Sequence, residues 1–206
     1  ALVVLERCDP DQPITVTYVE KEPTSMGLET GDIVSVRALL YGLLVASGND
    51  AAFALAASCA PTTGEFVKEM NGKARELNLK NTHFTNPAGF DDPAGYTTSY
   101  DLAYLARIAV ANPLISKIVS TKSTVVTTVS QNKTYYLENI NKLLGDVEGL
   151  SGIKTGQTEG SLEVLVTQTT RNDHTIVTVV LGSEDRFEDS RNLIEWAFAN
   201  HQWINP

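Results

Sequence analysis

The segment from Ala51 to Ala60 most constrains what this chain can fold into, because it is apolar on every side. A surface helix has one apolar stripe, whereas a helix that is apolar all round must be buried among other elements. Asn49 or Asp50, directly before the segment, can cap its first turn. The sequence therefore predicts a buried helix, against which other elements pack.

Helix-start signals precede other segments as well. Ser35, Thr62 and Thr98 are each placed to cap a first turn, and Glu65 completes a capping box with Thr62. Apolar spacing indicates one more, amphipathic helix near the C-terminal end of the chain. The expected helices cover residues 36–46, 63–77, 99–110 and 187–200.

Alternating apolar and polar residues predict extended structure elsewhere. Residues 13–36 have the pattern of short strands or extended loops, and three β segments lie near the end of the chain. The three segments cover Gly152–Thr158, Leu162–Thr170 and Thr175–Leu181, and Arg171–His174 has the composition of a hairpin turn. Helices in the middle of the chain and an antiparallel hairpin at its end indicate an α+β fold.

Composition limits the class of protein. A chain of 206 residues suffices for one domain, and apolar and charged fractions of 42% and 20% are those of a globular protein. The net charge of −9 disfavours non-specific binding to nucleic acid or to an anionic membrane, because both need a basic face. No apolar stretch is long enough to span a bilayer, and no signal peptide is visible. Ala1–Leu5 instead resembles the last turns of a helix, so we expect the chain to start within its domain.

Cysteine and acidic residues give weaker signals. Cys8 and Cys59 are the only cysteines. We interpret them as two buried free thiols, and the sequence leaves a single disulfide open. Asp91 and Asp92 indicate a solvated turn in the polar loop 81–95 rather than a calcium site. Since the three histidines are scattered as well, we expect no metal and no cofactor.

Two short motifs combine hydroxyl, amide and ammonium groups. Ser47-Gly48-Asn49 follows an apolar helix, and Lys154-Thr155-Gly156 lies in a predicted inner strand about a hundred residues later. Acyl transfer from an amide needs a nucleophilic hydroxyl, groups that move its proton, and donors for the developing oxyanion. A lysine in an inner strand is costly to bury without polar partners, so we expect it to lie in a cleft. Either tripeptide alone is more often an inter-helix turn or a strand end, and only the combination indicates a site.

In this order, the two motifs resemble two of the three catalytic motifs of the penicillin-binding and β-lactamase serine acyltransferases. Their flanks are similar to one subfamily, the serine-type D-alanyl-D-alanine carboxypeptidases, which are low-molecular-mass penicillin-binding proteins. The similarity covers nearly the whole chain and is carried by residues 39–52, 82–90, 100–103, 141–144 and 152–156. It implies a β-lactamase/transpeptidase-like fold over residues 1–206, with an antiparallel sheet flanked by helices and a helical subdomain in the middle of the chain.

The third motif of that family, Ser-x-x-Lys, carries the nucleophile. No serine upstream of Ser47 is followed by a lysine three residues later. Ala1–Glu6 resembles the stretch just downstream of that motif, so the resemblance implies that the nucleophile lies immediately before residue 1. The domain is then expected to be N-terminally incomplete and the isolated chain inactive.

The resemblance also implies roles for residues of this chain. Ser47 would relay protons, Asn49 would hold the substrate and the lysine of Ser-x-x-Lys, and Lys154 would supply positive charge to the same network. The other implied residues bind substrate. Thr155 and Arg186 would contact its terminal carboxylate, and Gly156 would let it approach the strand edge closely. The backbone N–H of Gln157 would form half of the oxyanion hole.

Two positions depart from the family pattern. Ala88 stands where the Asn-Pro-His-Gly loop usually has a histidine. Ser161-Leu162 replaces an Ala-Gly pair that often follows the third motif. Both departures bear on substrate detail rather than on the family.

The implied activity is that of a serine-type D-Ala-D-Ala carboxypeptidase, a hydrolase that trims peptidoglycan stem peptides through an acyl-enzyme and binds β-lactams covalently. The expected partners are a stem peptide or a β-lactam, together with the N-terminal segment if it is a separate chain. No nucleic-acid partner is expected, and membrane attachment is expected only through segments outside this chain. The resemblance implies a bacterial protein outside the cytoplasm, either in the cell envelope or secreted.

Two alternatives stay open. The first is a β-lactamase of the same fold, which is disfavoured by Gly48, where class A enzymes carry Asp, and by the loop Asn86–Gly89. The second is a non-catalytic peptidoglycan-binding or regulatory protein that never had the nucleophile.

Overall fold

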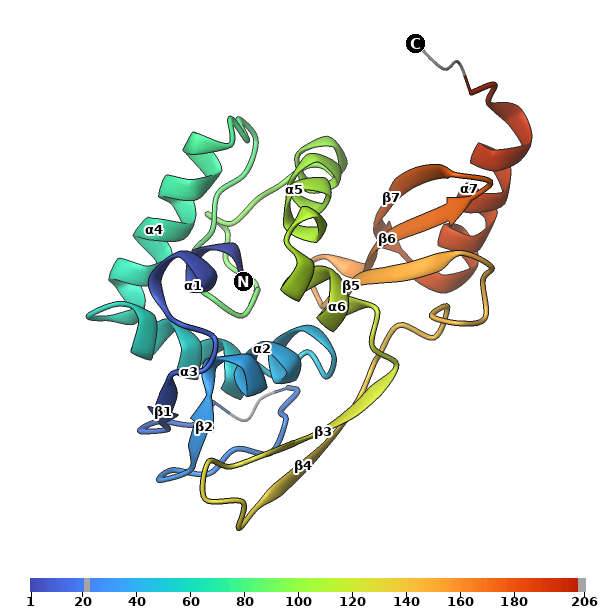
Figure 1. The fold of residues 1–206 in the computed structure, drawn as a ribbon. Coiled ribbons are helices and arrows are strands. Elements are labelled where there is room, and N and C mark those ends of the chain that lie inside the picture. Colours follow the sequence, from blue (N-terminus) through green and yellow to red (C-terminus); the bar gives the residue numbers. More distant parts are fainter. Residues whose placement is uncertain (21–22, 204–206) are drawn as a thin grey trace.

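The computed structural model describes residues 1–20 and 23–203. Most helices gather on one side of the molecule and the three-stranded sheet lies on the other, with a long two-stranded hairpin reaching away from both (Figure 1). The helices are α1 (Leu2–Arg7), α2 (Val36–Leu44), α3 (Asn49–Cys59), α4 (Thr63–Glu76), α5 (Ser99–Ala111), α6 (Pro113–Val119) and α7 (Arg186–Asn200). The strands are β1 (Pro13–Thr15), β2 (Ile33–Ser35), β3 (Ser123–Thr127), β4 (Thr134–Glu138), β5 (Leu150–Thr158), β6 (Leu162–Arg171) and β7 (His174–Ser183).

The sheet β5–β6–β7 is antiparallel and follows the order of the chain. Asn172 and Asp173 form the turn between β6 and β7, and both have a positive φ, of 48° and 63°. Such angles belong to the two-residue hairpin turn whose twist matches that of the flanking strands. The predicted β segments and their hairpin turn are therefore confirmed, and β5 begins slightly earlier than expected, at Leu150.

Helices cover both faces of this sheet (Figure 1). Neighbouring side chains in a strand point to opposite faces. Leu165 of β6 is fully buried in a cluster with Ile194 of α7. The next residue, Val166, packs on the other side against a cluster that contains Ala106 of α5 and Ile115 of α6. The sheet is thus a layer between α7 and the α5–α6 pair.

The predicted buried helix is α3, but its burial is confined to its first two turns. Ala51, Leu55 and Ala56 have almost no exposed surface. Ala57 and Ser58, in the last turn, are exposed. The expectation of burial along the whole segment is therefore wrong at its C-terminal end, where small residues meet solvent without cost.

The predicted cap of α3 is wrong as well. Gly48 is the N-cap and makes no side-chain hydrogen bond to the first turn, and Asn49 is already the first helical residue. The carboxylate of Asp50 mainly accepts hydrogen bonds from a neighbouring loop, residues 25–28. A partner that is distant in sequence therefore takes the side chain that local rules assign to the helix.

The other predicted caps are confirmed. The side chains of Ser35, Thr62 and Thr98 each accept a hydrogen bond from the backbone N–H three residues later. Sequence reasoning missed α6, because Asn112-Pro113 indicates the end of a helix. In the structure the same two residues also start the next helix, since Asn112 caps it and proline suits the first position, where no N–H is needed.

Cys8 and Cys59 form a disulfide, which corrects their interpretation as free thiols. The bond joins the residue after α1 to the last residue of α3, with the two Cα atoms 5.8 Å apart. The two cysteines are 51 residues apart in the chain, so only the packing of α1 against α3 brings them together. The bond fixes the relative position of these two helix ends.

Two properties of the described residues bear on what the fold can do. No single helix among them is long and apolar enough to cross a bilayer, and α5 with α6 meets that test only as a pair bent by 108°. In the same part of the chain, no group of three or more His, Cys, Asp and Glu side chains converges as metal ligands do.

We expect the disulfide to contribute about 4 kcal/mol to the free energy of unfolding, the value that chain entropy gives for a loop of this length. The double variant Cys8→Ala, Cys59→Ala should lose that amount. Urea unfolding monitored by far-UV circular dichroism measures it, with the reduced wild-type protein as the matched control. Equal unfolding midpoints for the oxidised and reduced wild type would contradict the prediction.

Candidate active site

Ser47 lies in the turn between α2 and α3, with a φ of 56°. A residue other than glycine in this left-handed region costs roughly 1–2 kcal/mol, so the surroundings must hold it there. The hydroxyl of Thr24 donates to the Ser47 carbonyl oxygen at 2.7 Å, and the Gly48 N–H donates to the Gly42 carbonyl oxygen at 2.9 Å. The turn is therefore held from both sides, and neither sequence motif includes Thr24.

Lys154, in the middle of β5, meets Ser47 across the molecule. Its ammonium Nζ donates to the Ser47 Oγ at 2.7 Å and to the Thr155 carbonyl oxygen at 2.7 Å. The first contact joins residues 107 positions apart. The structure thus brings together the two residues that the motifs single out, while their roles in a reaction stay predictions.

Burial makes the Lys154 ammonium less stable than an exposed one. Burial, and then repulsion from the Arg186 guanidinium, lower the pKa of Lys154 to about 8. No carboxylate forms an ion pair with Lys154 among the described residues. A lysine that titrates near neutral pH can hold a positive charge or release a proton under ordinary conditions.

Arg186 is the first residue of α7 and lies against β5. Its Nη1 donates to the Gly156 carbonyl oxygen at 2.8 Å, and its guanidinium lies 3.9 Å from the Glu163 carboxylate. Arg186 is 7% exposed, and its Nε has no hydrogen-bond acceptor among the described residues. The structure therefore brings a second cation to the Lys154-Thr155-Gly156 segment.

Thr155 is not brought to the side chains of Ser47 and Lys154. It lies directly opposite Leu165 in the sheet, and the side chain of Leu165 packs towards α7. Because neighbours in a strand alternate, Thr155 and Lys154 point to different faces of β5. Thr155 is 7% exposed and shares the α7 side of the strand with Arg186.

The other predicted site residues lie around this centre. Asn49 is buried, and its backbone N–H donates to the Thr24 carbonyl oxygen at 2.9 Å. Gln157 is exposed near the end of β5, which is an edge of the sheet β5–β6–β7. At Gly156 the close approach in the structure is to Val164, because a Cβ would lie 2.7 Å from its Cγ2. This glycine is therefore explained by packing inside the sheet, as well as by any approach of a substrate.

The loop with the departure at Ala88 is closed on itself. The Asn86 Oδ1 accepts hydrogen bonds from the N–H groups of Ala88, Gly89 and Phe90. Further along, the Asp91 carboxylate accepts one from the Gly160 N–H at 2.9 Å. The loop is thereby tied to the turn between β5 and β6. The Thr158 hydroxyl and the Gly160 N–H hold the pKa of Asp91 below its usual value.

The Ser161-Leu162 departure lies in the same turn. The hydroxyls of Ser161 and Thr158 are 2.7 Å apart, and the Ser161 N–H also donates to Thr158. Leu162 has a φ of 55° and is half exposed, where the usual glycine is free of such strain. The side chain of Leu162 therefore projects from the chain where the β5–β6 turn ends and β6 begins.

Two Ser-x-x-Lys strings do occur, but neither lies on a helix. Ser130 and Lys133 lie in the turn between β3 and β4, where the Ser130 hydroxyl donates to Asn132. Ser151 and Lys154 lie along β5, where residues three apart point to opposite faces. No helix in the described part of the chain carries a serine three residues before a lysine.

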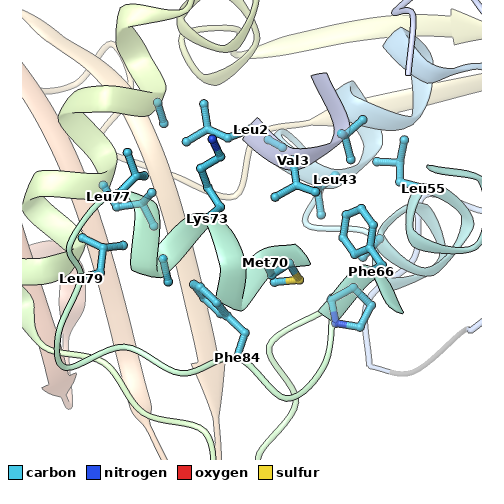
Figure 2. A pocket seen from close by; sticks show the side chains of 17 residues that line it. Leu2, Val3, Leu43, Leu55, Phe66, Met70, Lys73, Leu77, Leu79 and Phe84 are labelled. Carbon is cyan, nitrogen blue, oxygen red and sulfur yellow. The ribbon is translucent and has the colours of Figure 1, made fainter. Parts of the chain in front are cut away.

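An apolar cavity of about 200 Å³ lies apart from this centre (Figure 2). Its walls come from helices α1 to α5 and from the segment after α4, with side chains such as Leu55, Phe66, Met70 and Phe84 pointing into it. None of the residues implied in catalysis lines it. This cavity is therefore separate from the residues that the two motifs single out.

A family model described as D-alanyl-D-alanine carboxypeptidase matches residues 6–185. Among curated proteins, the chain is 35% identical over 207 residues to D-alanyl-D-alanine carboxypeptidase DacD of Escherichia coli, covering 94% of this chain and 52% of that protein. It is 32% identical over 216 residues to D-alanyl-D-alanine carboxypeptidase DacB2 of Mycobacterium tuberculosis, covering 100% of this chain and 72% of that protein.

Solved structures agree in fold. The Streptomyces K15 DD-transpeptidase superposes with a TM-score of 0.85 at 31% identity, over 96% of this chain and 83% of that chain. A penicillin-binding protein homologue from Mycobacterium tuberculosis superposes with a TM-score of 0.90 at 29% identity, over 100% and 81% of the two chains. The fold is thus the transpeptidase-like α+β fold that the sequence predicts.

The chain belongs to the D-alanyl-D-alanine carboxypeptidase family. It spans about half the length of several curated relatives that it matches, for example 46% of DacF from Bacillus subtilis and 52% of DacD. The alignments that show the family therefore cover most of this chain and about half of the length of those relatives.

We expect the Lys154 amine to titrate near pH 8 rather than near 10.5. The ammonium that donates to Ser47 is then present below about pH 8 and lost above it. Because the unfolded chain holds its proton up to the higher pH, this group makes the free energy of unfolding rise between pH 8 and 10.5.

Nuclear magnetic resonance of the protein with ¹³C-labelled lysine side chains measures this titration. The signal of Lys154 is assigned by its loss in Lys154→Ala, and the lysine signals of the urea-unfolded protein serve as the reference. A Lys154 midpoint that coincides with that of the unfolded protein would show that burial does not act on this amine.

Proposed function

We propose that the protein is a serine-type D-Ala-D-Ala carboxypeptidase that acts on peptidoglycan stem peptides and binds β-lactams covalently. The single observation that carries this proposal is the hydrogen bond between the Lys154 ammonium and the Ser47 hydroxyl beside the edge of β5. Membership of the family supplies the reaction class.

We propose that the nucleophile is the serine of a Ser-x-x-Lys motif outside these 206 residues. Its Oγ attacks the carbonyl carbon of the penultimate D-alanine, and the C–N bond to the terminal D-alanine breaks. The proton lost by the nucleophile passes through the neighbouring lysine and Ser47 to the leaving amine. Water then hydrolyses the ester, which returns the serine and releases the shortened peptide.

The site would bind the substrate at two negatively charged groups, the terminal carboxylate and the oxyanion that forms during acylation. The Lys154 ammonium and the Arg186 guanidinium both reach β5, and two cations at one strand favour a substrate with a free carboxylate. Thr155 would add its hydroxyl to that carboxylate from the α7 side. The backbone N–H of Gln157 and that of the nucleophile would bind the oxyanion.

The β-lactamase alternative of class A has a steric obstacle. A Cβ on Gly48 would lie 2.7 Å from the Asp50 Oδ1 and 3.0 Å from the Met26 backbone nitrogen. The aspartate that class A enzymes carry at this position therefore has no room in this turn. Slow rather than rapid release of a bound penicillin is the expected behaviour.

We propose that the protein works outside the cytoplasm. The disulfide between Cys8 and Cys59 supports this, because such bonds form and persist in oxidising compartments. The stem peptides on which the family acts also belong to the cell wall. Residues 1–206 would then belong to the transpeptidase-like domain of this protein.

The full-length protein should release D-alanine from a diacyl-Lys-D-Ala-D-Ala peptide, and Lys154→Ala should slow acylation by on the order of 10²-fold, as expected for loss of a charge-stabilising group. Thr155→Val should mainly weaken recognition of substrates with a free carboxylate. D-alanine release and penicillin acylation rates measure both effects. An undiminished acylation rate in Lys154→Ala would mean that this lysine is only structural.

The 206 residues alone should form no covalent adduct with a penicillin, because no described helix carries Ser-x-x-Lys and Ser47 acts as a relay. Intact-mass spectrometry after incubation with benzylpenicillin measures this, and the full-length protein is the positive control. A stoichiometric adduct on Ser47 in the 206-residue chain would overturn both the relay role and the assignment of the nucleophile.

A further inference from the structure

We propose that Asp50 is a positioning residue for acyl transfer: its buried carboxylate holds the loop Thr24–Leu28, and this loop holds the backbone of Ser47. The inference rests on the proposed function, since it concerns the same site. Asp50 follows the Ser47-Gly48-Asn49 motif directly, yet it touches the motif mainly through a segment more than twenty residues earlier.

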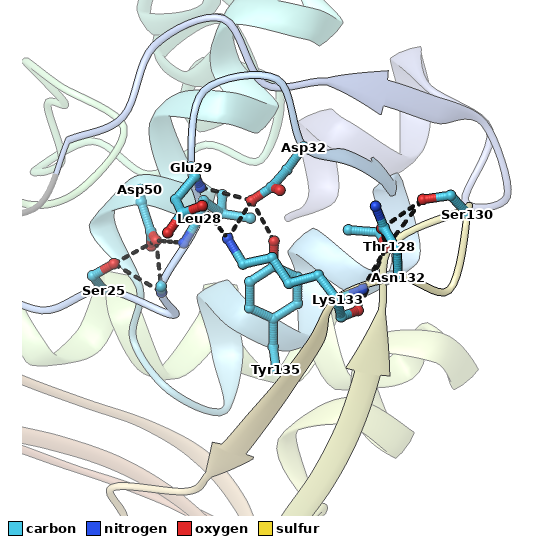
Figure 3. A network of polar contacts seen from close by, with 11 residues as sticks. Ser25, Leu28, Glu29, Asp32, Asp50, Thr128, Ser130, Asn132, Lys133 and Tyr135 are labelled. Carbon is cyan, nitrogen blue, oxygen red and sulfur yellow. Dashed lines mark hydrogen bonds and ion pairs between the residues drawn. The ribbon is translucent and has the colours of Figure 1, made fainter.

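The Asp50 carboxylate organises the loop beside α3 (Figure 3). Asp50 is fully buried, and no described residue forms an ion pair with it. A buried charge without a counter-ion persists only if hydrogen-bond donors surround it. Five donors do so here: for Oδ1 the N–H groups of Met26 (2.9 Å) and Ala51 (2.9 Å), and for Oδ2 the Ser25 hydroxyl (2.5 Å) and the N–H groups of Gly27 (3.1 Å) and Leu28 (3.0 Å).

The same loop reaches the motif at its other end. The Thr24 hydroxyl donates to the Ser47 carbonyl oxygen at 2.7 Å, and the Thr24 carbonyl oxygen accepts from the Asn49 N–H at 2.9 Å. These two bonds fix the backbone on both sides of Gly48. They therefore hold Ser47 in its unfavourable positive-φ conformation, from which its Oγ meets Lys154.

Close packing transmits the position of the carboxylate to the turn. Gly48 leaves no space between the turn, the Asp50 Oδ1 and the Met26 N–H, as the contacts of an added Cβ show. A shift of the loop by a fraction of an ångström therefore moves the Ser47 turn as well. Proton transfer needs donor and acceptor within hydrogen-bond distance, so such a shift slows a relay through Ser47.

A double-mutant cycle separates positioning from general stability. Acylation of the full-length protein by benzylpenicillin is measured for wild type, Asp50→Asn, Ser47→Ala and the double variant, each at a temperature where it is folded. Asp50→Asn places an amide N–H against backbone N–H groups, and we expect it to slow acylation by about 10- to 100-fold. In the Ser47→Ala background it should change the rate less than about twofold, because the group it positions is gone. An equal loss in both backgrounds would overturn the proposal.

If Asp50→Asn does not fold, Thr24→Val tests the same link between the loop and the Ser47 backbone. This nearly isosteric change removes only the hydrogen bond to the Ser47 carbonyl oxygen, and we expect the same dependence on Ser47 with a loss of about tenfold. The matched control is Asp32→Asn, in the neighbouring loop of Figure 3. The Asp32 carboxylate is also mostly buried and is bound by Lys133, Tyr135 and the Glu29 N–H, without a contact to the Ser47 turn. Slowing by Asp32→Asn equal to that by Thr24→Val would overturn the proposal.

The titration of Lys154 gives a readout that does not need an active enzyme. A hydrogen bond from the ammonium to Ser47 stabilises the charged form, so displacing Ser47 should lower the Lys154 midpoint further below pH 8. The Arg186 guanidinium is the other charge that acts on Lys154 in the described structure, and none of these variants changes it. A lower midpoint in Thr24→Val and an unchanged one in Asp32→Asn are expected, and an unchanged midpoint in both would overturn the proposal. Failure of the wild type to react with penicillin would instead count against the proposed function.

Discussion

The hydrogen bond from Lys154 to Ser47 is the contact on which the site depends, because it joins the helical part of the molecule to the sheet. Neither partner belongs to an element that could place it alone. Helix α6 lies between the two parts and packs against both. Ile118 of α6 packs in the cluster that includes α2, and Val119 packs in the cluster under β5. A seven-residue helix without any motif residue therefore acts as the spacer of the site.

The local charge at β5 is positive, whereas the net charge of the whole protein is negative. The chain carries a net charge of −9, yet two buried or partly buried cations, Lys154 and Arg186, reach one strand. The carboxylate nearest to them, Glu163, lies 3.9 Å from Arg186 and forms no bond with Lys154. The local field is thus positive where the strand edge is open, and the acidic surface elsewhere would keep anionic ligands from binding at random.

Sequence reasoning succeeded where the determining contacts are local. Ser35, Thr62 and Thr98 bind N–H groups three residues away, so their roles follow from the sequence alone. Local rules failed for Asp50, whose donors lie in a distant loop, and for Asn112, whose side chain caps a second helix after ending the first. The disulfide was missed for the same reason, since helix packing and not spacing brings its cysteines together.

In the candidate site, too, some residues could be predicted from the sequence and others are identified only by the structure. Ser47 and Lys154 could be singled out from their motifs, and the structure adds their contact. Thr155 belongs to the same motif as Lys154, but strand alternation points its side chain to the α7 side. Thr24 carries no motif, and its importance appears only once the Ser47 carbonyl oxygen is seen to need a donor. A residue such as Thr24, which binds only the backbone of a motif, cannot be recognised from the pattern of reactive side chains.

The disulfide also has a consequence for the part of the chain that carries Ser47. The covalent loop that it closes, residues 8–59, contains the Ser47 turn and no residue of β5, β6 or β7. Opening of the sheet would therefore separate Lys154 from Ser47 while the Ser47 turn stays inside a covalently closed loop.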